Sequence, residues 1–313
     1  MGQMDANMVM LERARAALWG VAVGDAFGKL AEGLWPDQVV SRYGGKFEDY
    51  RVKDPKHGGY WSFGEVTDDT TFTILTAESI IENHGVEEKD IVRRIAARPI
   101  KGWPGWKEFD TGLALSGAIR RTGTGAPMRA APFGIIHATG RLSELCKDVY
   151  AGCRCTHNSQ SAIGAACAMA ACLSAALEGM EKISALGVAS EAARMGEKLG
   201  MEDYLPHVSR RIEWILNVYV PTGIAKRGAL NPGFTAVEGA TNALYLFAKH
   251  DSARDGILEA VNQGGDADSI ASMAGGLLAA YRPETLPGEW IEIVRNNNPV
   301  DMDALADRLV KLR

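Results

Sequence analysis

The chain has 313 residues, a length that suits two average domains or one large one. Apolar residues make up 46% of the sequence, which is enough to fill a large core. The 34 basic and 39 acidic side chains give a net charge of −5, and no basic block occurs along the chain. This balance disfavours binding to the phosphate backbone of nucleic acids as the main role, so no nucleic-acid partner is expected.

The N-terminal segment is not expected to act as a targeting signal. Asp5, Glu12 and Arg13 interrupt it before any apolar run reaches the length of a signal-peptide core. Ala6 does not fit the pattern for N-terminal myristoylation. We therefore expect a cytoplasmic protein that binds no membrane.

The region from Cys146 to Gly179 is rich in small and apolar residues. It contains all five cysteines, an odd number, and a chain of this length needs no disulfide to fold, so reduced thiols are expected. The segment Ser161–Gly179 is long enough to cross a membrane, but its many Ala, Ser and Gly residues make it only weakly hydrophobic. We expect it to form a central buried helix.

Helical periodicity dominates the sequence, because apolar residues recur at three- and four-residue spacing and alternation with a period of two is almost absent. The predicted helices are, in chain order, Met8–Val23, Asp69–Asn83, Glu88–Ala97, Ala114–Arg121, Leu142–Ala151, Ser161–Glu178, Lys182–Leu199, Leu205–Val218, Val237–His250, Ala253–Asn262, Ser269–Tyr281 and Met302–Leu312. The Gly- and Pro-rich segments between them end helices and do not resemble domain linkers. The sequence predicts an all-α fold in which residues 1–313 form a single compact multi-helix domain.

The first motif along the chain is the glycine-spaced segment Gly20–Gly28, whose glycines permit close helix packing. Asp25 lies within it and Glu32 follows seven residues later. Asp25 suits either a functional site or a buried hydrogen bond at a helix end. Glu32 suits either a functional carboxylate or a surface charge, and this segment alone does not decide between them.

Two acidic pairs lie at predicted helix starts. The first is Asp68-Asp69, which follows the potential N-cap residue Thr67. The second is in Gly264–Ser269, which reads GGDADS and runs into the next predicted helix. One such pair is readily explained by the preference of helix N-termini for negative charge. Two pairs carry more charge than the caps require.

The two helix starts together offer four carboxylates and several hydroxyls, without His or Cys. Such a set of hard oxygen donors suits Mg²⁺ or Mn²⁺ better than Zn²⁺. If the two starts face each other, one or two divalent cations would neutralise the four charges. Other acid-rich motifs fit poorly: Ile270 and Ala271 stand where an EF-hand needs an oxygen ligand and a glycine, and no DDxxD prenyl-transfer motif follows Asp68.

The sequence resembles the ADP-ribosylglycohydrolases in five ordered motifs. They are the GDAFG segment with Glu32, the TDDT box at Thr67–Thr70, the turn Gly123–Arg129 followed by Pro132, the Thr156-His157 pair, and the GGDADS box. Each motif is weak alone, but the ordered set is specific and spans nearly the whole chain. The resemblance implies a hydrolase that cleaves the C1-linked glycosidic bond of ADP-ribosylated substrates. It also implies an all-α domain with a central cleft that holds two divalent cations, Mg²⁺ or Mn²⁺.

The resemblance assigns roles to individual residues. The metal ligands that it implies are Thr67, Asp68, Asp69, Asp266, Asp268 and Ser269. The catalytic residues that it implies are Glu32 and Asp68. The substrate-binding residues that it implies are Asp110, Gly112, Gly123, Thr124, Gly125, Met128 and His157. Ser269 stands where the family usually has Thr and keeps the hydroxyl, whereas Thr124 replaces a common Asn and loses an amide.

The implied chemistry agrees with general principles. A metal pair can chelate the cis-diol of a ribose and lower the pKa of a bound water, and nearby carboxylates meet the charge that develops at the anomeric carbon. Asp110 beside the leaving group would pair with a guanidinium through two parallel hydrogen bonds, which makes ADP-ribosyl-arginine on protein the expected substrate. Asp110 also suits a helix cap. The alternative functions are hydrolysis of a small free ribosyl or nucleoside-like glycoside and non-catalytic binding of ADP-ribose.

Two further groups have alternative interpretations. Cys153, Cys155 and His157 lack a fourth ligand at zinc-site spacing, so the thiols are expected only to pack, and His157 suits either a substrate contact or a helix-entry residue. Three tryptophans beside Gly and Pro suit either stacking on an adenine or filling gaps between helices, and we favour the second. They are Trp61, Trp103 and Trp106.

Overall fold

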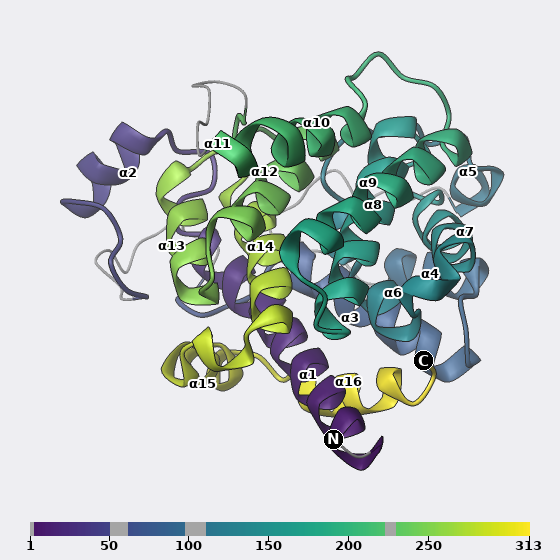
Figure 1. The fold of residues 1–313 in the computed structure, drawn as a ribbon, viewed down its shortest axis with the longest axis horizontal. Helices are drawn as coiled ribbons and strands as arrows, with labels where there is room; N and C mark the ends of the chain where they lie inside the picture. The colour runs from purple at the N-terminus through teal and green to yellow at the C-terminus, as the bar shows by residue number, and fades with distance from the viewer. Residues whose placement is uncertain (1–2, 51–61, 98–110, 223–229) are drawn as a thin grey trace.

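The computed structural model describes residues 3–50, 62–97, 111–222 and 230–313. These residues form helices joined by turns and loops, and no strand occurs among them (Figure 1). Two isolated β-bridges join Gly123 to Thr235 and Ser159 to Met201. The predicted all-α class is confirmed for the described part of the chain.

The α-helices follow one another along the chain from α1 to α16. They are α1 (Gln3–Gly28), α2 (Pro36–Tyr43), α3 (Asp68–Asn83), α4 (Glu88–Ala97), α5 (Thr111–Ser116), α6 (Ala131–Ile136), α7 (Leu142–Cys153), α8 (Gln160–Leu177), α9 (Lys182–Leu199), α10 (Val208–Trp214), α11 (Val220–Thr222), α12 (Ala236–Lys249), α13 (Ala253–Gln263), α14 (Ala267–Tyr281), α15 (Gly288–Asn297) and α16 (Met302–Val310). Short 3₁₀ turns are η2 (Pro127–Arg129), η3 (Thr139–Arg141) and η5 (Pro283–Thr285), and a π-helical turn, η4 (Ile215–Tyr219), joins α10 to α11.

Helices α1 and α14 lie side by side through the middle of the molecule (Figure 1). Their backbones touch directly at the glycines of α1. A Cβ atom on Gly24 would lie 2.1 Å from the carbonyl oxygen of Ala271, and one on Gly28 would lie 2.3 Å from that of Ala267. Only glycine permits this approach, which explains the glycine spacing of the first motif.

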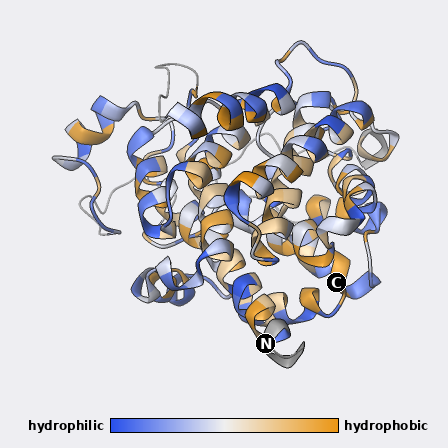
Figure 2. Ribbon diagram, in the orientation of Figure 1, coloured by the Kyte–Doolittle hydropathy of each residue, from blue (hydrophilic) through white to orange (hydrophobic). Residues whose placement is uncertain are grey.

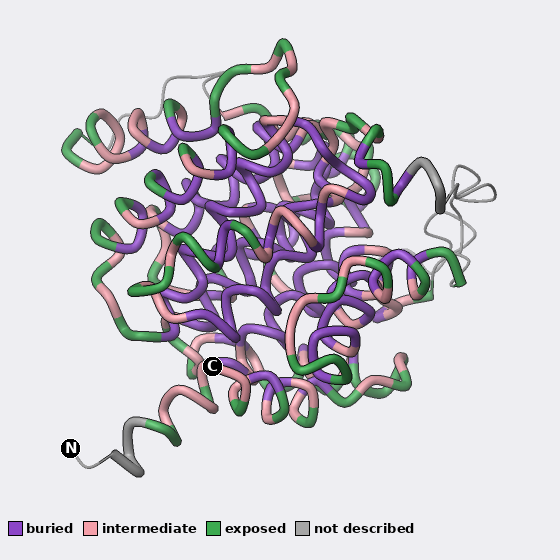
Figure 3. Tube along the Cα trace, turned by 90° about the vertical axis from the view of Figure 1, so that its right-hand side faces the viewer, coloured by how far each residue is buried: buried purple, intermediate pink, exposed green. Residues whose placement is uncertain are grey.

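Helix α8 is the second central element. Every residue from Ser161 to Leu177 is buried. Hydrophobic residues gather on the inner helices (Figure 2), and the buried parts of the chain lie inside while exposed ones lie at the periphery (Figure 3). Among the described helices, α8 alone has the length and composition to cross a membrane, and 94% of it is buried inside the protein. It is the predicted buried core helix. All five cysteines are unpaired and buried, as expected.

Most predicted helices are present with ends shifted by a few residues. The prediction for Ala114–Arg121 is wrong at its C-terminal end, because α5 stops before Gly117, which adopts the left-handed conformation (φ 69°). The prediction for Leu205–Val218 is replaced by α10 and the π-helical turn η4. Helices α2, α6 and α15 were not predicted. They are short and begin at or beside Pro or Gly, so they show too few turns of apolar periodicity.

Candidate active site

The starts of α3 and α14 face each other, a relation that the sequence left open. The hydroxyl of Ser269 lies 3.4 Å from Asp69 Oδ2 and 3.4 Å from Thr124 Oγ1. These contacts bring both acidic pairs and the Gly123–Arg129 turn into one region. Asp69, Asp266 and Asp268 are at most 4% exposed there.

Asp25 holds the start of α3 from a neighbouring helix. Its carboxylate accepts hydrogen bonds from the backbone N–H of Thr67 (2.9 Å) and Thr70 (3.0 Å) and from their hydroxyls (2.7 and 2.5 Å). Burial raises the pKa of Asp25 to about 6 although these hydrogen bonds oppose the shift. Asp25 is therefore a buried hydrogen bonder at a helix end. Thr67 donates its hydroxyl proton to Asp25, so the lone pairs of the Thr67 hydroxyl oxygen remain available to a cation. The Thr67 side chain makes no capping hydrogen bond to α3.

Lys29 is an ammonium group set beside the acidic residues. It forms ion pairs with Glu32 and with Asp268 Oδ2, the latter at 3.5 Å. Burial favours a lower pKa for Lys29, but the charges of Asp268 and Glu32 outweigh it and raise the pKa above its ordinary value. Glu32 has 30% of its side chain exposed, so this paired carboxylate lies between the buried acids and solvent.

The buried carboxylates are incompletely hydrogen-bonded and repel one another. Asp69 Oδ1 and Asp266 Oδ2 are buried without a hydrogen-bond partner among the described residues. Burial, followed by repulsion from neighbouring carboxylates, raises the pKa values of Asp69 and Asp266 well above the ordinary value. Burial likewise raises the pKa of Asp268 to about 6. A bound cation would satisfy such a cluster, since it pairs with the orphaned oxygens and favours the charged carboxylates.

The carboxylate and hydroxyl oxygens therefore fit a divalent cation, but their side chains are not arranged around a common centre. No three carboxylate, imidazole or thiol groups of the described residues converge closely enough to enclose an ion. Asp68 is less buried than Asp69, and burial is again the main cause of its raised pKa. The structure thus shows two acidic helix starts that face each other, without a set of side chains that encloses an ion among the described residues.

The Gly123–Arg129 turn packs against His157. A Cβ atom on Gly125 would lie 2.4 Å from His157 Cε1, so the imidazole occupies the space that a side chain would need. Thr124 is 9% exposed and bonds to Ser269, whereas Met128 is buried in a small apolar cluster with Phe72. The turn thereby connects His157 to the acidic region.

Some predicted residues cannot be placed. Asp110 and the three tryptophans Trp61, Trp103 and Trp106 lie outside the described residues. Gly112 lies in α5, near its first residue. The predicted contact of Asp110 with a leaving group stays a prediction.

Arg129, at the end of the Gly123–Arg129 turn, is a buried residue that no sequence motif marks as functional. It is 0% exposed, and its Nη2 donates to the Gly152 carbonyl (3.1 Å) and to Thr156 Oγ1 (2.8 Å). Thr156 Oγ1 lies 2.9 Å from His157 Nδ1. The available signal was a single arginine in the otherwise apolar stretch Ala126–Phe133.

The thiols beside His157 are buried and lie against backbone carbonyl groups. Cys153 and Cys155 are buried, and their sulfurs lie 3.9 Å from the Ala126 carbonyl oxygen and 3.6 Å from that of Gly152. Burial raises the pKa of Cys155 to about 11, which keeps the thiol protonated. These contacts agree with the packing role expected from the sequence.

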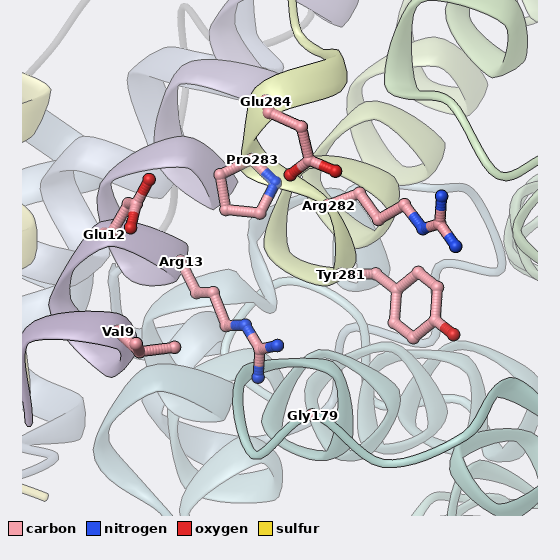
Figure 4. A pocket seen from close by; sticks show the side chains of 8 residues that line it. All are labelled: Val9, Glu12, Arg13, Gly179, Tyr281, Arg282, Pro283 and Glu284. Carbon is pink, nitrogen blue, oxygen red and sulfur yellow. The ribbon is translucent and has the colours of Figure 1, made fainter. Parts of the chain in front are cut away.

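A surface pocket of about 400 Å³ lies at the other end of α14 (Figure 4). Arg13 of α1 and Gly179, which follows α8, line it together with Tyr281 and Arg282. The fifteen residues of α14 place it roughly 20 Å from the acidic residues at 1.5 Å per residue. It is therefore separate from the candidate site.

Comparisons with known proteins identify a family and several similar proteins. Residues 6–313 match the sequence model of the family described as ADP-ribosylglycohydrolase. The ADP-ribosyl-[dinitrogen reductase] glycohydrolase of Rhodospirillum rubrum is 24% identical over 90% of this chain and 89% of that protein. The ADP-ribosylarginine hydrolase Tri1 of Pseudomonas putida is 27% identical over 91% of this chain and 74% of that protein. A solved structure titled ADP-ribosylglycohydrolase-related protein complex has a TM-score of 0.71 and 27% identity, and covers 97% of this chain and 98% of its own.

Proposed function

Because the chain belongs to the ADP-ribosylglycohydrolase family, we propose that it hydrolyses the C1-linked glycosidic bond of an ADP-ribosylated substrate. The observation that carries the proposal is the contact between Ser269 and Asp69, which sets the two acidic helix starts against each other. Hard oxygen ligands in this arrangement suit metal-assisted hydrolysis.

Two divalent cations, Mg²⁺ or Mn²⁺, belong to the proposal. The residues that would hold them are Thr67, Asp68, Asp69, Asp266, Asp268 and Ser269. Two features support this ligand set: the orphaned oxygens of Asp69 and Asp266, and the free lone pairs of the Thr67 hydroxyl. When bound, the cations supply Lewis-acid chemistry that lowers the pKa of water and orients a ribose diol.

Four residues of the protein have separate proposed roles in orienting ligands and in catalysis. Asp25 orients Thr67 through two hydrogen bonds, and Lys29 holds the Glu32 carboxylate next to Asp268. Glu32 and Asp68 are less buried than Asp69 and are the proposed catalytic carboxylates. Their partial exposure leaves them within reach of substrate and of the proton that water must release.

ADP-ribosyl-arginine on protein is the proposed substrate. Two similar proteins carry names that include ADP-ribosyl-[dinitrogen reductase] and ADP-ribosylarginine, which supports this class. Asp110 is the residue proposed to recognise the guanidinium. The Gly123–Met128 turn, Gly112 and His157 are proposed to hold the rest of the ADP-ribosyl group.

The test measures release of ADP-ribose from an ADP-ribosyl-arginine protein, with a simple N-riboside as the competing substrate. We expect release that requires Mg²⁺ or Mn²⁺, that Asp268→Asn abolishes, and that the exposed control Asp37→Asn retains. Full activity in metal-stripped enzyme would contradict the metal proposal. Faster cleavage of the N-riboside would favour the small-glycoside alternative, and ADP-ribose binding without turnover would favour a non-catalytic role.

A further inference from the structure

Arg129 is a buried guanidinium whose charge is not matched by a carboxylate. It has no exposed surface, the described residues form no ion pair with it, and its guanidinium carbon lies 5.9 Å from the centroid of the Phe72 ring. Its Nε and Nη1 atoms find no acceptor in the described chain. Burying an unpaired charge is costly, so the hydrogen bonds that Arg129 does make are expected to have a specific purpose. One of them, 2.8 Å long, goes to Thr156 Oγ1.

The hydroxyl of Thr156 has one proton and two lone pairs, and Arg129 occupies one lone pair. Two acceptors are within reach of the proton: His157 Nδ1 at 2.9 Å and the Cys153 carbonyl oxygen at 3.3 Å. The Cys153 carbonyl already accepts the backbone N–H groups of Thr156 (3.1 Å) and His157 (3.0 Å), which fill its two lone pairs. The shorter, unsaturated acceptor is His157 Nδ1.

A ring nitrogen that accepts a hydrogen bond carries no proton, so a neutral His157 is protonated at Nε2. The surroundings keep the ring neutral. Burial, followed by the positive charges of Arg129 and Arg121, lowers the pKa of His157 well below its ordinary value.

We propose that Arg129 and Thr156 are positioning residues that hold His157 in its Nε2-protonated tautomer and present that N–H to a ligand at the Gly123–Gly125 turn. The ring lies against this turn, since a Cβ atom on Gly125 would lie 2.4 Å from its Cε1 and 2.8 Å from its Nε2. The next residue in the turn, Thr124, lies 3.4 Å from Ser269 through its hydroxyl. The donor therefore lies beside the acidic region and not in an isolated part of the core.

The hydrogen bonds that run from Arg129 through Thr156 to His157 form a relay, and their direction determines which kind of ligand group can bind. Arg129 donates to Thr156, Thr156 donates to His157, and His157 is left with an N–H to donate. Hydrogen bonds aligned in this way polarise one another, and the guanidinium charge behind them adds to the pull on an acceptor. The ligand group is an oxygen acceptor, best an anionic one such as a phosphate oxygen. This choice of ligand rests on the proposed function, whereas the tautomer does not.

The tautomer is tested on the full chain labelled with ¹⁵N-histidine, by two-bond ¹H–¹⁵N correlation spectra, with His157→Gln to assign the signal. We expect Nε2-protonated His157 in the parent, a redistribution toward the Nδ1-protonated form in Thr156→Val, and recovery in Thr156→Ser. Thr76→Val is the matched control, because the buried Thr76 hydroxyl has no partner among the described residues and its loss leaves the relay intact. An Nδ1-protonated parent, or a Thr156→Val spectrum like that of the parent, would overturn the proposal.

The ligand is tested by calorimetric titration with ADP-ribose. We expect Thr156→Val to bind about tenfold more weakly than the parent and Thr156→Ser to bind normally. Equal affinity in Thr156→Val would overturn the ligand assignment. If the parent has the expected tautomer but binds no ADP-ribose, the proposed function fails and the relay stands. Arg129→Met removes a buried cation and endangers the fold, so the test uses Thr156.

Discussion

The Ser269 hydroxyl lies 3.4 Å from Asp69 Oδ2, although 200 positions separate the two residues in the sequence. This contact places the start of α14 against the start of α3 and concentrates buried carboxylates around it. The negative charges of neighbouring carboxylates raise the pKa of Asp69, because buried like charges destabilise one another unless protons or cations compensate them.

Divalent cations are expected to raise the melting temperature of the protein. Under the proposed function they would bind the folded acidic cluster and not the unfolded chain, so a concentration 100 times the dissociation constant would add about 2.7 kcal/mol to the free energy of unfolding. Thermal unfolding with Mg²⁺, with Mn²⁺ and with chelator measures the effect, and Asp69→Asn should reduce it while Asp37→Asn should not. Identical melting temperatures with metal and with chelator would refute the expectation.

Lys29→Met is expected to strengthen cation binding. The Lys29 ammonium lies 3.5 Å from Asp268 Oδ2 and opposes the approach of a second positive charge. Two unit charges 4 Å apart interact with about 4 kcal/mol at an effective dielectric constant of 20, and about 1.4 kcal/mol of relief equals a tenfold gain in affinity. Calorimetric titration with Mn²⁺ measures it, with exposed Lys89→Met as the control. Unchanged or weaker Mn²⁺ binding would show that Lys29 supports the ligands and does not compete with the ion.

Glu259 makes the stability of the protein depend on pH. Burial opposes its ionisation, but hydrogen bonds from His250 and Lys249 prevail and lower its pKa to about 2. A carboxylate with a lowered pKa in the folded state contributes stability above its ordinary pKa of about 4.5, and this contribution is lost as pH falls toward 2. Glu259→Gln should therefore lower the free energy of unfolding by about 2 kcal/mol at pH 7 and by almost nothing at pH 2. The value at pH 7 is reduced because 26% of the side chain is exposed to solvent.

Urea unfolding at the two pH values measures this difference, with exposed Glu284→Gln as the control. An equal cost of Glu259→Gln at pH 7 and pH 2 would show that its packing, and not its charge, is what matters.

Gly24→Ala is expected to destabilise the fold by roughly 3 kcal/mol or more, because its Cβ atom would lie 2.1 Å from the Ala271 carbonyl oxygen. Gly187→Ala is the matched control. It also lies in a helix, but its Cβ atom would meet nothing within 4 Å, so the change should stabilise the protein by up to about 1 kcal/mol. Chemical denaturation compares the two variants, and similar stabilities would refute the close contact of α1 with α14.

Asp110→Ala tests the arginine linkage. If Asp110 pairs with the guanidinium, hydrolysis of ADP-ribosyl-arginine should fall at least about tenfold, equivalent to about 1.4 kcal/mol, while the melting temperature in the presence of metal stays within a few degrees. A large fall in melting temperature with unchanged turnover would make Asp110 a structural cap. Faster cleavage of a serine-linked substrate by the parent would overturn the linkage itself.

The sequence was informative where a local rule operates. Regular apolar spacing predicted long helices such as α8 and α14, and motif order indicated the two acidic helix starts. It did not show that the Asp25 carboxylate would hold the start of α3, because Asp25 in α1 and Thr67 just before α3 are 42 positions apart in the sequence. Nor did it show the Arg129–Thr156 hydrogen bond across 27 positions. Spacing encodes neighbours on one helix, whereas these pairs depend on how the helices pack.

The direct backbone contact between α1 and α14 has a consequence for ligand binding. Where Gly24 and Gly28 meet Ala271 and Ala267, no side chain between the helices can change rotamer to let them slide. Asp25 and Asp268 are thus preorganised, so binding of a ligand beside them requires little further ordering of their side chains. A rigid frame of this kind leaves adaptation to the surrounding loops, so relatives with other substrates should differ there and keep the glycine contact.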